Sequence, residues 1–125
     1  MREILFRGKR ADNEKWVIGY LSSKHTITIT TPCGHTDEIV ICADTVGQFT
    51  GLTDKNGKRI FDGDVAKVLQ GKDKDIAYVG FENGAFMLYP KTGNIYERTL
   101  WEYWYNDWDV EVIGNITDNP ELLEK

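Results

Sequence analysis

Residues 25–30 read His-Thr-Ile-Thr-Ile-Thr, and this strict alternation is the clearest periodic signal in the chain. Successive side chains of a strand point to opposite faces, so the two isoleucines would lie on one face and the threonines on the other. The pattern therefore predicts a half-buried β-strand. Extended runs at 4–7, 16–21 and 38–42, separated by turn-like segments, surround it. Residues 1–42 are thus predicted to form a β-meander of about four strands.

The composition of the whole chain also favours strands. Val, Ile and Thr make 30 of the 125 residues, whereas Ala contributes only 5. β-branched side chains lose rotamer freedom in a helix and pack well on a pleated sheet. The Asn56-Gly57 pair predicts a two-residue hairpin turn with positive φ at both positions. Further strands are predicted at 65–69, 76–81, 85–89 and 109–116.

The entry into the strand at 65–69 indicates an architecture for the second half of the chain. A Gly-Asp pair, Gly63-Asp64, leads into spaced valines. Many small SH3-like barrels begin a strand with the same sequence pattern, so the comparison is an analogy. The predicted fold class is mainly β: an N-terminal β-meander, an SH3-like small barrel and a short helix near the C-terminus. A single domain of residues 1–125 is expected, with lobes at 1–45 and 46–125.

A run of aromatic residues near the C-terminus is the most unusual feature of the chain's composition. Trp101, Trp104, Tyr105 and Trp108 are spaced at i, i+3, i+4 and i+7, which favours one face of a helix. A strand is the alternative, with Trp101, Tyr103 and Tyr105 on one face. Two roles stay open: a contact surface that binds another chain, or a lid over the core with its polar tips outward.

The net charge of −5 is unevenly distributed. Residues 101–125 carry one basic and seven acidic groups, so this segment supplies the whole negative excess. An acidic chain lacks the basic stripe that binding to a duplex requires, so nucleic acid is not an expected partner. Charge interrupts the N-terminus before any signal-peptide apolar region forms, and no apolar run reaches the length of a membrane span. A cytoplasmic protein without membrane contact is expected.

Three blocks of sequence resemble the YopX family of phage and prophage proteins. They lie at the start, middle and end of the chain, at residues 2–7, 48–65 and 111–123. The resemblance implies a small, mostly β protein of phages and integrated phages, and it supplies no catalytic residues to carry over. It implies that the matched residues determine the fold: the turn residues are Gly51, Asn56, Gly57, Gly63 and Asp64, and the core residues include Ile60, Val65, Val112 and Ile113.

Two groups of residues could form a metal or catalytic site, but for both a purely structural role in the fold is preferred. Two Cys and two His are a suitable ligand set for zinc, but only one pair is close in sequence. No metal and no cofactor are therefore predicted, and the two cysteines are expected as reduced thiols. The ligand candidates are His25, Cys33, His35 and Cys42.

The carboxylates Asp54, Asp62 and Asp64 could bind a hard metal ion or act in acid–base catalysis, but Asp and Gly together are what tight turns need. Asp64 is the best exception, since at a strand entry it could accept backbone N–H bonds and still face solvent.

The sequence therefore predicts a non-enzymatic phage accessory protein that acts by binding, as a homo-oligomer or against a bacterial host protein. A small hydrolase around Asp62 and Asp64 is one alternative. The other alternative is a nucleic-acid-associated protein. It would gain support if six basic side chains cluster on one face: Lys55, Lys58, Arg59, Lys67, Lys72 and Lys74.

Overall fold

The computed structural model describes residues 4–124, which divide into two compact units, one up to Gly51 and one from Leu52 onward. Strands make up 55% of the structure and helices 11%, in two antiparallel sheets with one short α-helix. The predicted mainly β class is confirmed. The first matched block begins with Arg2 and Glu3, which lie outside the described residues.

The first unit is built from a meander of four strands in chain order, and the predicted meander is confirmed. A short 3-10 helix and strand β5 follow, and β5 returns to pair with β1. Ile27 is fully buried and Ile29 half-buried, as the alternation at 25–30 predicts. The elements of this unit are β1 (Phe6–Lys9), β2 (Trp16–Ser23), β3 (Thr26–Thr30), β4 (Thr36–Val40), η1 (Ala43–Thr45) and β5 (Gly47–Thr53), the last of which ends in the second unit.

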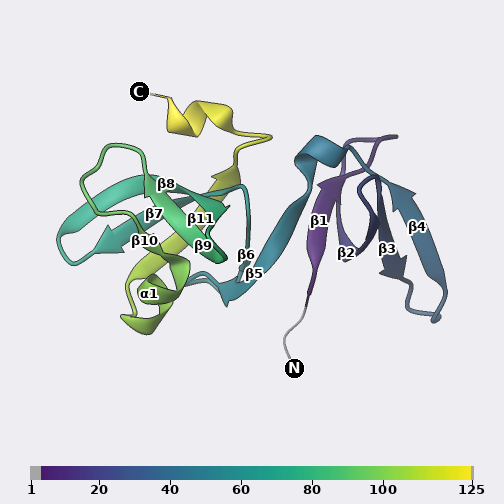
Figure 1. The fold of residues 1–125 in the computed structure, drawn as a ribbon, viewed down its shortest axis with the longest axis horizontal. Coiled ribbons are helices and arrows are strands. Elements are labelled where there is room, and N and C mark those ends of the chain that lie inside the picture. Colours follow the sequence, from purple (N-terminus) through teal and green to yellow (C-terminus); the bar gives the residue numbers. More distant parts are fainter. Residues whose placement is uncertain (1–3, 125) are drawn as a thin grey trace. The chain divides into compact units, whose positions relative to one another are not determined.

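The second unit contains a five-stranded antiparallel sheet in the order β10-β9-β8-β7-β11, together with β6, which pairs with β5. The α-helix α1 follows β10 directly and lies beside it (Figure 1). The elements are β6 (Arg59–Phe61), β7 (Asp64–Gln70), β8 (Asp73–Glu82), β9 (Ala85–Pro90), β10 (Arg98–Thr99), α1 (Leu100–Tyr105), β11 (Asp109–Asn115) and η2 (Pro120–Leu123).

The core of the second unit lies on one face of this sheet. Alternate residues of β7, β8, β9 and β11 point into it because side chains of a strand alternate between faces. From α1, the side chains of Leu100 and Tyr103 join this core. The buried cluster comprises Ile60, Ala66, Val68, Ala77, Val79, Leu88, Ile95, Leu100, Tyr103 and Val110.

Two details of the second unit differ from the prediction. The sheets are not closed, so an SH3-like barrel is not confirmed. Ile60 and Val65 are buried as the resemblance implies, but Ile113 is 39% exposed. The register of β11 against β7 shifts between Val112 and Gly114, and this bulge takes Ile113 out of the regular alternation.

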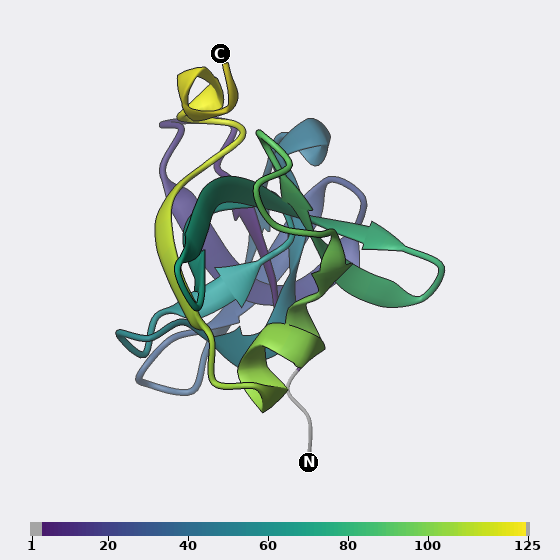
Figure 2. The ribbon, with the colours of Figure 1, turned by 90° about the vertical axis from the view of Figure 1, so that its left-hand side faces the viewer.

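The chain has two Asn-Gly turns, and they adopt different conformations. At 83–84 both residues have positive φ, 53° and 82°, in the two-residue turn that joins β8 to β9. This hairpin extends away from the rest of its sheet (Figure 2). At 56–57 only Gly57 has positive φ, 82°, so the prediction for Asn56 is wrong. There the loop has three residues, because the Asp54 N–H donates to Lys58 O and the Gly57 N–H donates to Asp54 O.

Candidate binding surface on helix α1

Helix α1 is only six residues long, and both of its ends are capped. The Thr99 hydroxyl accepts a hydrogen bond from the Glu102 backbone N–H at 3.2 Å, while the Glu102 carboxylate reaches back to the same hydroxyl at 3.4 Å. Arg98 adds an ion pair with Glu102 at 3.0 Å. Because so short a helix is unstable in isolation, these caps and its buried side chains hold it in place.

The C-terminal end of α1 is closed by a Schellman motif. Asp107 has a left-handed φ of 57°. The Trp108 N–H donates to Tyr103 O at 3.0 Å and the Asp107 N–H donates to Trp104 O at 3.2 Å, which is the hydrogen-bond pattern of that motif. Trp108 therefore follows the helix instead of continuing its face, and the prediction that it shares a helical face with Trp101 is wrong.

Three aromatic side chains of α1 point away from the core. Trp101, Trp104 and Tyr105 are 55%, 59% and 67% exposed. The rings of Trp101 and Tyr105 stack with their centroids 5.0 Å apart. In the following sections these three side chains are called the aromatic surface. They account for three of the four residues that the sequence singled out.

The remaining aromatic side chains of this segment contribute to the core. Tyr103 is fully buried, and Trp108 packs edge-to-face against it with ring centroids 5.3 Å apart. The Arg98 guanidinium lies 5.5 Å from the centroid of the Trp108 ring. The segment is therefore divided: Tyr103 and Trp108 cover the core, as the lid role expects, whereas the aromatic surface faces solvent.

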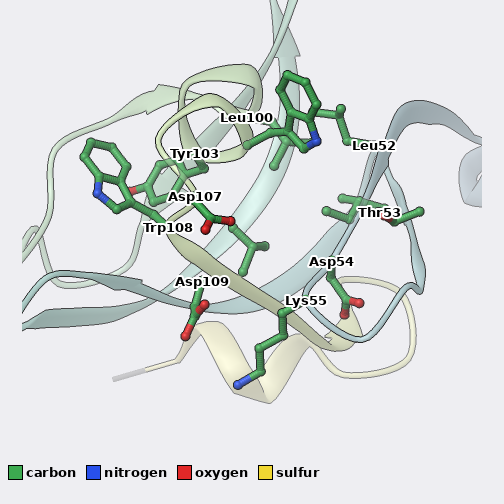
Figure 3. A pocket seen from close by; sticks show the side chains of 12 residues that line it. Leu52, Thr53, Asp54, Lys55, Leu100, Tyr103, Asp107, Trp108 and Asp109 are labelled. Atoms are coloured by element: carbon green, nitrogen blue, oxygen red, sulfur yellow. The ribbon is translucent and has the colours of Figure 1, made fainter.

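A cavity of about 200 Å³ opens beside the aromatic surface. Figure 3 shows Trp108 and Tyr103 on one side of it, Leu52 and Thr53 on the other, Asp107 between them and Asp109 below. Within residues 4–124, the carboxylates of Asp107 and Asp109 accept no hydrogen bond and pair with no cation. The full lining is Leu52, Thr53, Asp54, Lys55, Ile60, Leu100, Tyr103, Trp104, Asp107, Trp108, Asp109 and Val110.

The third carboxylate of this cavity, Asp54, is fully engaged in holding the fold. Its Oδ1 accepts the backbone N–H groups of Asn56 and Lys58, and its Oδ2 accepts that of Val112, each at 2.9 Å. Burial alone would raise the pKa of this carboxyl, but the backbone donors and the Lys58 charge outweigh it, and the pKa is lowered overall. Asp54 thus connects the 54–58 turn to β11 and stays ionised.

The buried phenol of Tyr103 is the other polar group of this region. Its hydroxyl has no hydrogen-bond partner within the described part of the chain. Burial raises its pKa, with a smaller opposing effect from Arg98. The group is therefore a neutral phenol at physiological pH.

The carboxylates considered for catalysis lie in turns, where they take part in holding the backbone or are half-buried. Asp64 is 1% exposed, and its Oδ2 accepts the Phe61 N–H at 2.7 Å. The expectation that Asp64 faces solvent is therefore wrong, because its carboxylate is turned inward to the 61–64 turn. Asp62 lies in that same turn, half-buried. Among residues 4–124, no three His, Cys, Asp or Glu side chains are close enough together to hold a metal ion.

The zinc candidates all belong to the first unit. Cys33 and Cys42 are exposed free thiols. His25 is exposed in the turn between β2 and β3, and His35 in the turn before β4. The structure does not bring these four side chains together as a ligand set.

Sequence reasoning did not find several residues that position the aromatic surface. Thr99 and Glu102 form the Thr-x-x-Glu signature of a capping box, so this signal was present in the sequence. Asp107 gave no comparable signal, since Asp is less common than Gly in a left-handed helix end. Tyr103 was placed only in the alternative strand pattern, whereas it is the buried anchor of α1.

The fold and this surface define a class: a small, mainly β protein with two antiparallel sheets and a short, solvent-exposed aromatic helix. The chain belongs to the YopX family, whose model, described as YopX protein, matches residues 5–124. The resemblance drawn from the three sequence blocks is thereby confirmed.

Among solved structures, the chain is similar to that described as the crystal structure of protein EF1440 from Enterococcus faecalis. The two are 22% identical, with a TM-score of 0.57, and the match covers 99% of this chain and 100% of that one. This likeness shows a shared fold. No curated protein matches the chain. Within residues 4–124, no helix has the length and apolar character needed to cross a bilayer.

Proposed function

We propose that this YopX protein acts by binding another protein through the aromatic surface of α1, and not by catalysis. The observation that carries the proposal is the exposure of Trp101, Trp104 and Tyr105, each more than half open to solvent. Aromatic anchors surrounded by polar side chains are typical of the centres of protein interfaces. The role is that of an accessory protein encoded by a phage or prophage, in the cytoplasm of a bacterial host, with a second copy or a host protein as the partner.

The hydrolase alternative has little support. A general acid or base needs a carboxylate that can exchange protons with a substrate. The Asp64 carboxylate is buried against backbone, and that of Asp54 accepts three N–H groups. Neither of these two carboxylates is available to exchange a proton with a substrate.

The arrangement of basic side chains argues against the nucleic-acid alternative. All six candidate cations are exposed, but acidic groups lie among them. Lys55 is 3.6 Å from a Glu111 carboxylate oxygen, and Lys67 pairs with Glu111 in register across β7 and β11. Glu111 therefore reduces the positive charge around Lys55 and Lys67, which argues against a continuous basic stripe for phosphate contacts.

Affinity capture from a host lysate, read by mass spectrometry, tests the proposal. The wild-type chain is compared with the double variant Trp101→Ser/Trp104→Ser, and Tyr20→Ser is the control because Tyr20 is 60% exposed on β2 of the first unit. We expect a protein, or a second copy of the tagged chain, to be retained by the wild type and the control and lost by the double variant. Equal capture by all three proteins would contradict binding through this surface.

A further inference from the structure

We infer that the partner presents an arginine-rich segment, and that one arginine of this segment enters the cavity lined by Asp107 and Asp109 while others lie on the aromatic surface. The inference rests on the proposed function, since it names the chemistry of the partner that this surface binds.

Charge complementarity is the first argument. The C-terminal segment from residue 101, which forms α1, β11 and η2, carries seven acidic groups against one basic group. Asp107 and Asp109 both line the cavity, and neither carboxylate has a partner among residues 4–124. The one lysine of its lining, Lys55, is already directed to Glu111. Unpaired carboxylates beside aromatic side chains are complementary to a guanidinium group, which carries a positive charge and several hydrogen-bond donors.

The aromatic rings are the second argument. A guanidinium stacks on the face of Trp or Tyr more readily than an ammonium does. Within this chain, Arg98 already lies 5.5 Å from the ring centroid of Trp108, and in the first unit Arg7 lies 4.8 Å from that of Trp16. The stacked pair of Trp101 and Tyr105 offers exposed rings of the same kind. These rings favour arginine over lysine.

The size of the surface is the third argument. Three side chains that are 55–67% exposed offer only about 300–450 Å² for burial, whereas a stable globular complex buries about 800 Å² on each partner. The cavity, at about 200 Å³, is also smaller than the usual small-molecule pocket of about 300–1,000 Å³. A short extended segment with one inserted side chain fits both dimensions.

A second copy of this chain is a poorer occupant. Asp107 and Asp109 form an acidic rim beside the aromatic surface. In a two-fold symmetric dimer the same patch faces itself, so the acidic rim of one copy would face that of the other. Like charges opposed across an interface are unfavourable. The acidic rim therefore selects a basic partner and disfavours self-association through this face.

Fluorescence anisotropy with a labelled peptide tests the inference. The probe is a fluorescein-labelled decapeptide with six arginines spaced by glycines, and the matched probes replace arginine with lysine or with citrulline, which is neutral. For the wild-type protein we expect the arginine peptide to bind at least about tenfold more tightly than the citrulline peptide. We also expect it to bind more tightly than the lysine peptide, with an affinity that falls as salt rises from 50 to 200 mM.

Matched variants locate the binding. The double variant Asp107→Asn/Asp109→Asn should weaken binding of the arginine peptide at least about tenfold, and asparagine keeps the left-handed preference needed at position 107. Its control is Asp37→Asn/Asp44→Asn, which makes the same change of net charge on exposed residues of the first unit and should leave affinity within about twofold. Trp101→Ser/Trp104→Ser should also weaken binding, and Tyr20→Ser should not.

Each contrary result has its own meaning. Equal losses in both acidic double variants would show unspecific attraction to a negative protein and would overturn the inference. Equal affinity for the arginine and citrulline peptides would do the same. If the wild type binds no peptide but forms dimers in light scattering that Trp104→Ala dissociates, a second copy is the occupant, and the inference fails while the proposed function stands. If the wild type binds no peptide, forms no such dimers and shows capture that does not depend on the surface, the proposed function fails as well.

Discussion

Removing the Asp54 carboxylate should destabilise the second unit strongly, because this one side chain connects segments that are 58 positions apart. It is 7% exposed and accepts three backbone N–H groups at 2.9 Å each. In Asp54→Ala the N–H groups of Asn56 and Lys58 lie on exposed residues and can turn to water. The N–H of the half-buried Val112 on β11 has less access to it.

The magnitude follows from the hydrogen bonds. A hydrogen bond to a charged group contributes about 1.5–3 kcal/mol, and those replaced by water contribute less, so the total for Asp54→Ala is about 3–5 kcal/mol. Asp54→Asn should cost about 1–2 kcal/mol, because the amide oxygen still accepts the two turn donors while its NH₂ faces the N–H of Val112.

The cost should also depend on pH. The pKa of Asp54 is lowered in the folded chain, so its contribution is present above the ordinary carboxyl pKa of about 3.9 and is lost as pH falls through the lower, folded-state value. The stability difference between wild type and Asp54→Asn should therefore be constant near neutral pH and shrink in acid.

Urea unfolding provides the measurement, followed by far-ultraviolet dichroism and by tryptophan fluorescence, since three of the four tryptophans lie in the second unit. Asp12→Ala is the control: Asp12 makes two bonds of 2.9 Å with Arg10, but on an exposed surface, and its loss should change stability little. A cost below about 1 kcal/mol for Asp54→Ala, or a cost equal to that of the control, would refute the reasoning.

Three further predictions concern the turns and the metal. Gly57→Val should lower the free energy of unfolding in urea by about 1–2 kcal/mol. Since φ of Gly57 is +82° and no atom lies within 4 Å of the added Cβ, this cost is conformational. Gly57→Asn should cost far less, and equal costs for the two variants would argue against this explanation. Asp75→Asn should destabilise the 91–94 loop by about 1–3 kcal/mol near neutral pH, because the Asp75 carboxylate accepts both the N–H and the hydroxyl of Thr92. Because the pKa of Asp75 is lowered in the folded chain, this cost should shrink in acid, and unfolding should show a smaller cost at pH 3 than at pH 7. Elemental analysis of protein purified without chelator should find no stoichiometric zinc, and about one zinc per chain, lost in Cys33→Ser, would contradict this.

The strands could be predicted from the sequence where periodicity was local and undisturbed. Residues 25–30 alternate without interruption, and β3 occupies 26–30. Strand β5 was not predicted, because Gly47 and Gly51 interrupt its pattern and its partner β1 is some forty positions earlier in the sequence. Pairing between distant segments leaves no local periodic signal.

The two Asn-Gly turns show why a dipeptide does not determine a turn. At 83–84 the flanking residues Glu82 and Ala85 pair directly, so the loop has two residues and both take positive φ. At 56–57 the Asp54 side chain accepts the N–H groups of Asn56 and Lys58, which stabilises a three-residue loop. The choice between them lies in a side chain outside the dipeptide.

The aromatic segment was predicted in composition but not in its division between core and solvent. Its spacing fitted a helix of two turns, yet α1 ends at Tyr105 because Asp107 adopts a left-handed conformation and closes a Schellman motif. This early end directs Trp108 onto Tyr103 and away from the helical face. Backbone conformation at one residue therefore decides which aromatic rings are buried, and neighbouring sequence did not indicate it.

The exposure of the aromatic surface is not required by the fold. Helix α1 is held by its two caps and by Leu100 and Tyr103, which are 2% and 0% exposed and complete the core of the second unit. Trp101, Trp104 and Tyr105 could be polar without opening a cavity in that core. Exposed aromatic side chains in a patch raise the tendency to aggregate, and soluble proteins rarely carry them without an interaction to make. The acidic rim offsets that tendency by keeping like surfaces apart, which is the combination that binding to a basic partner would require.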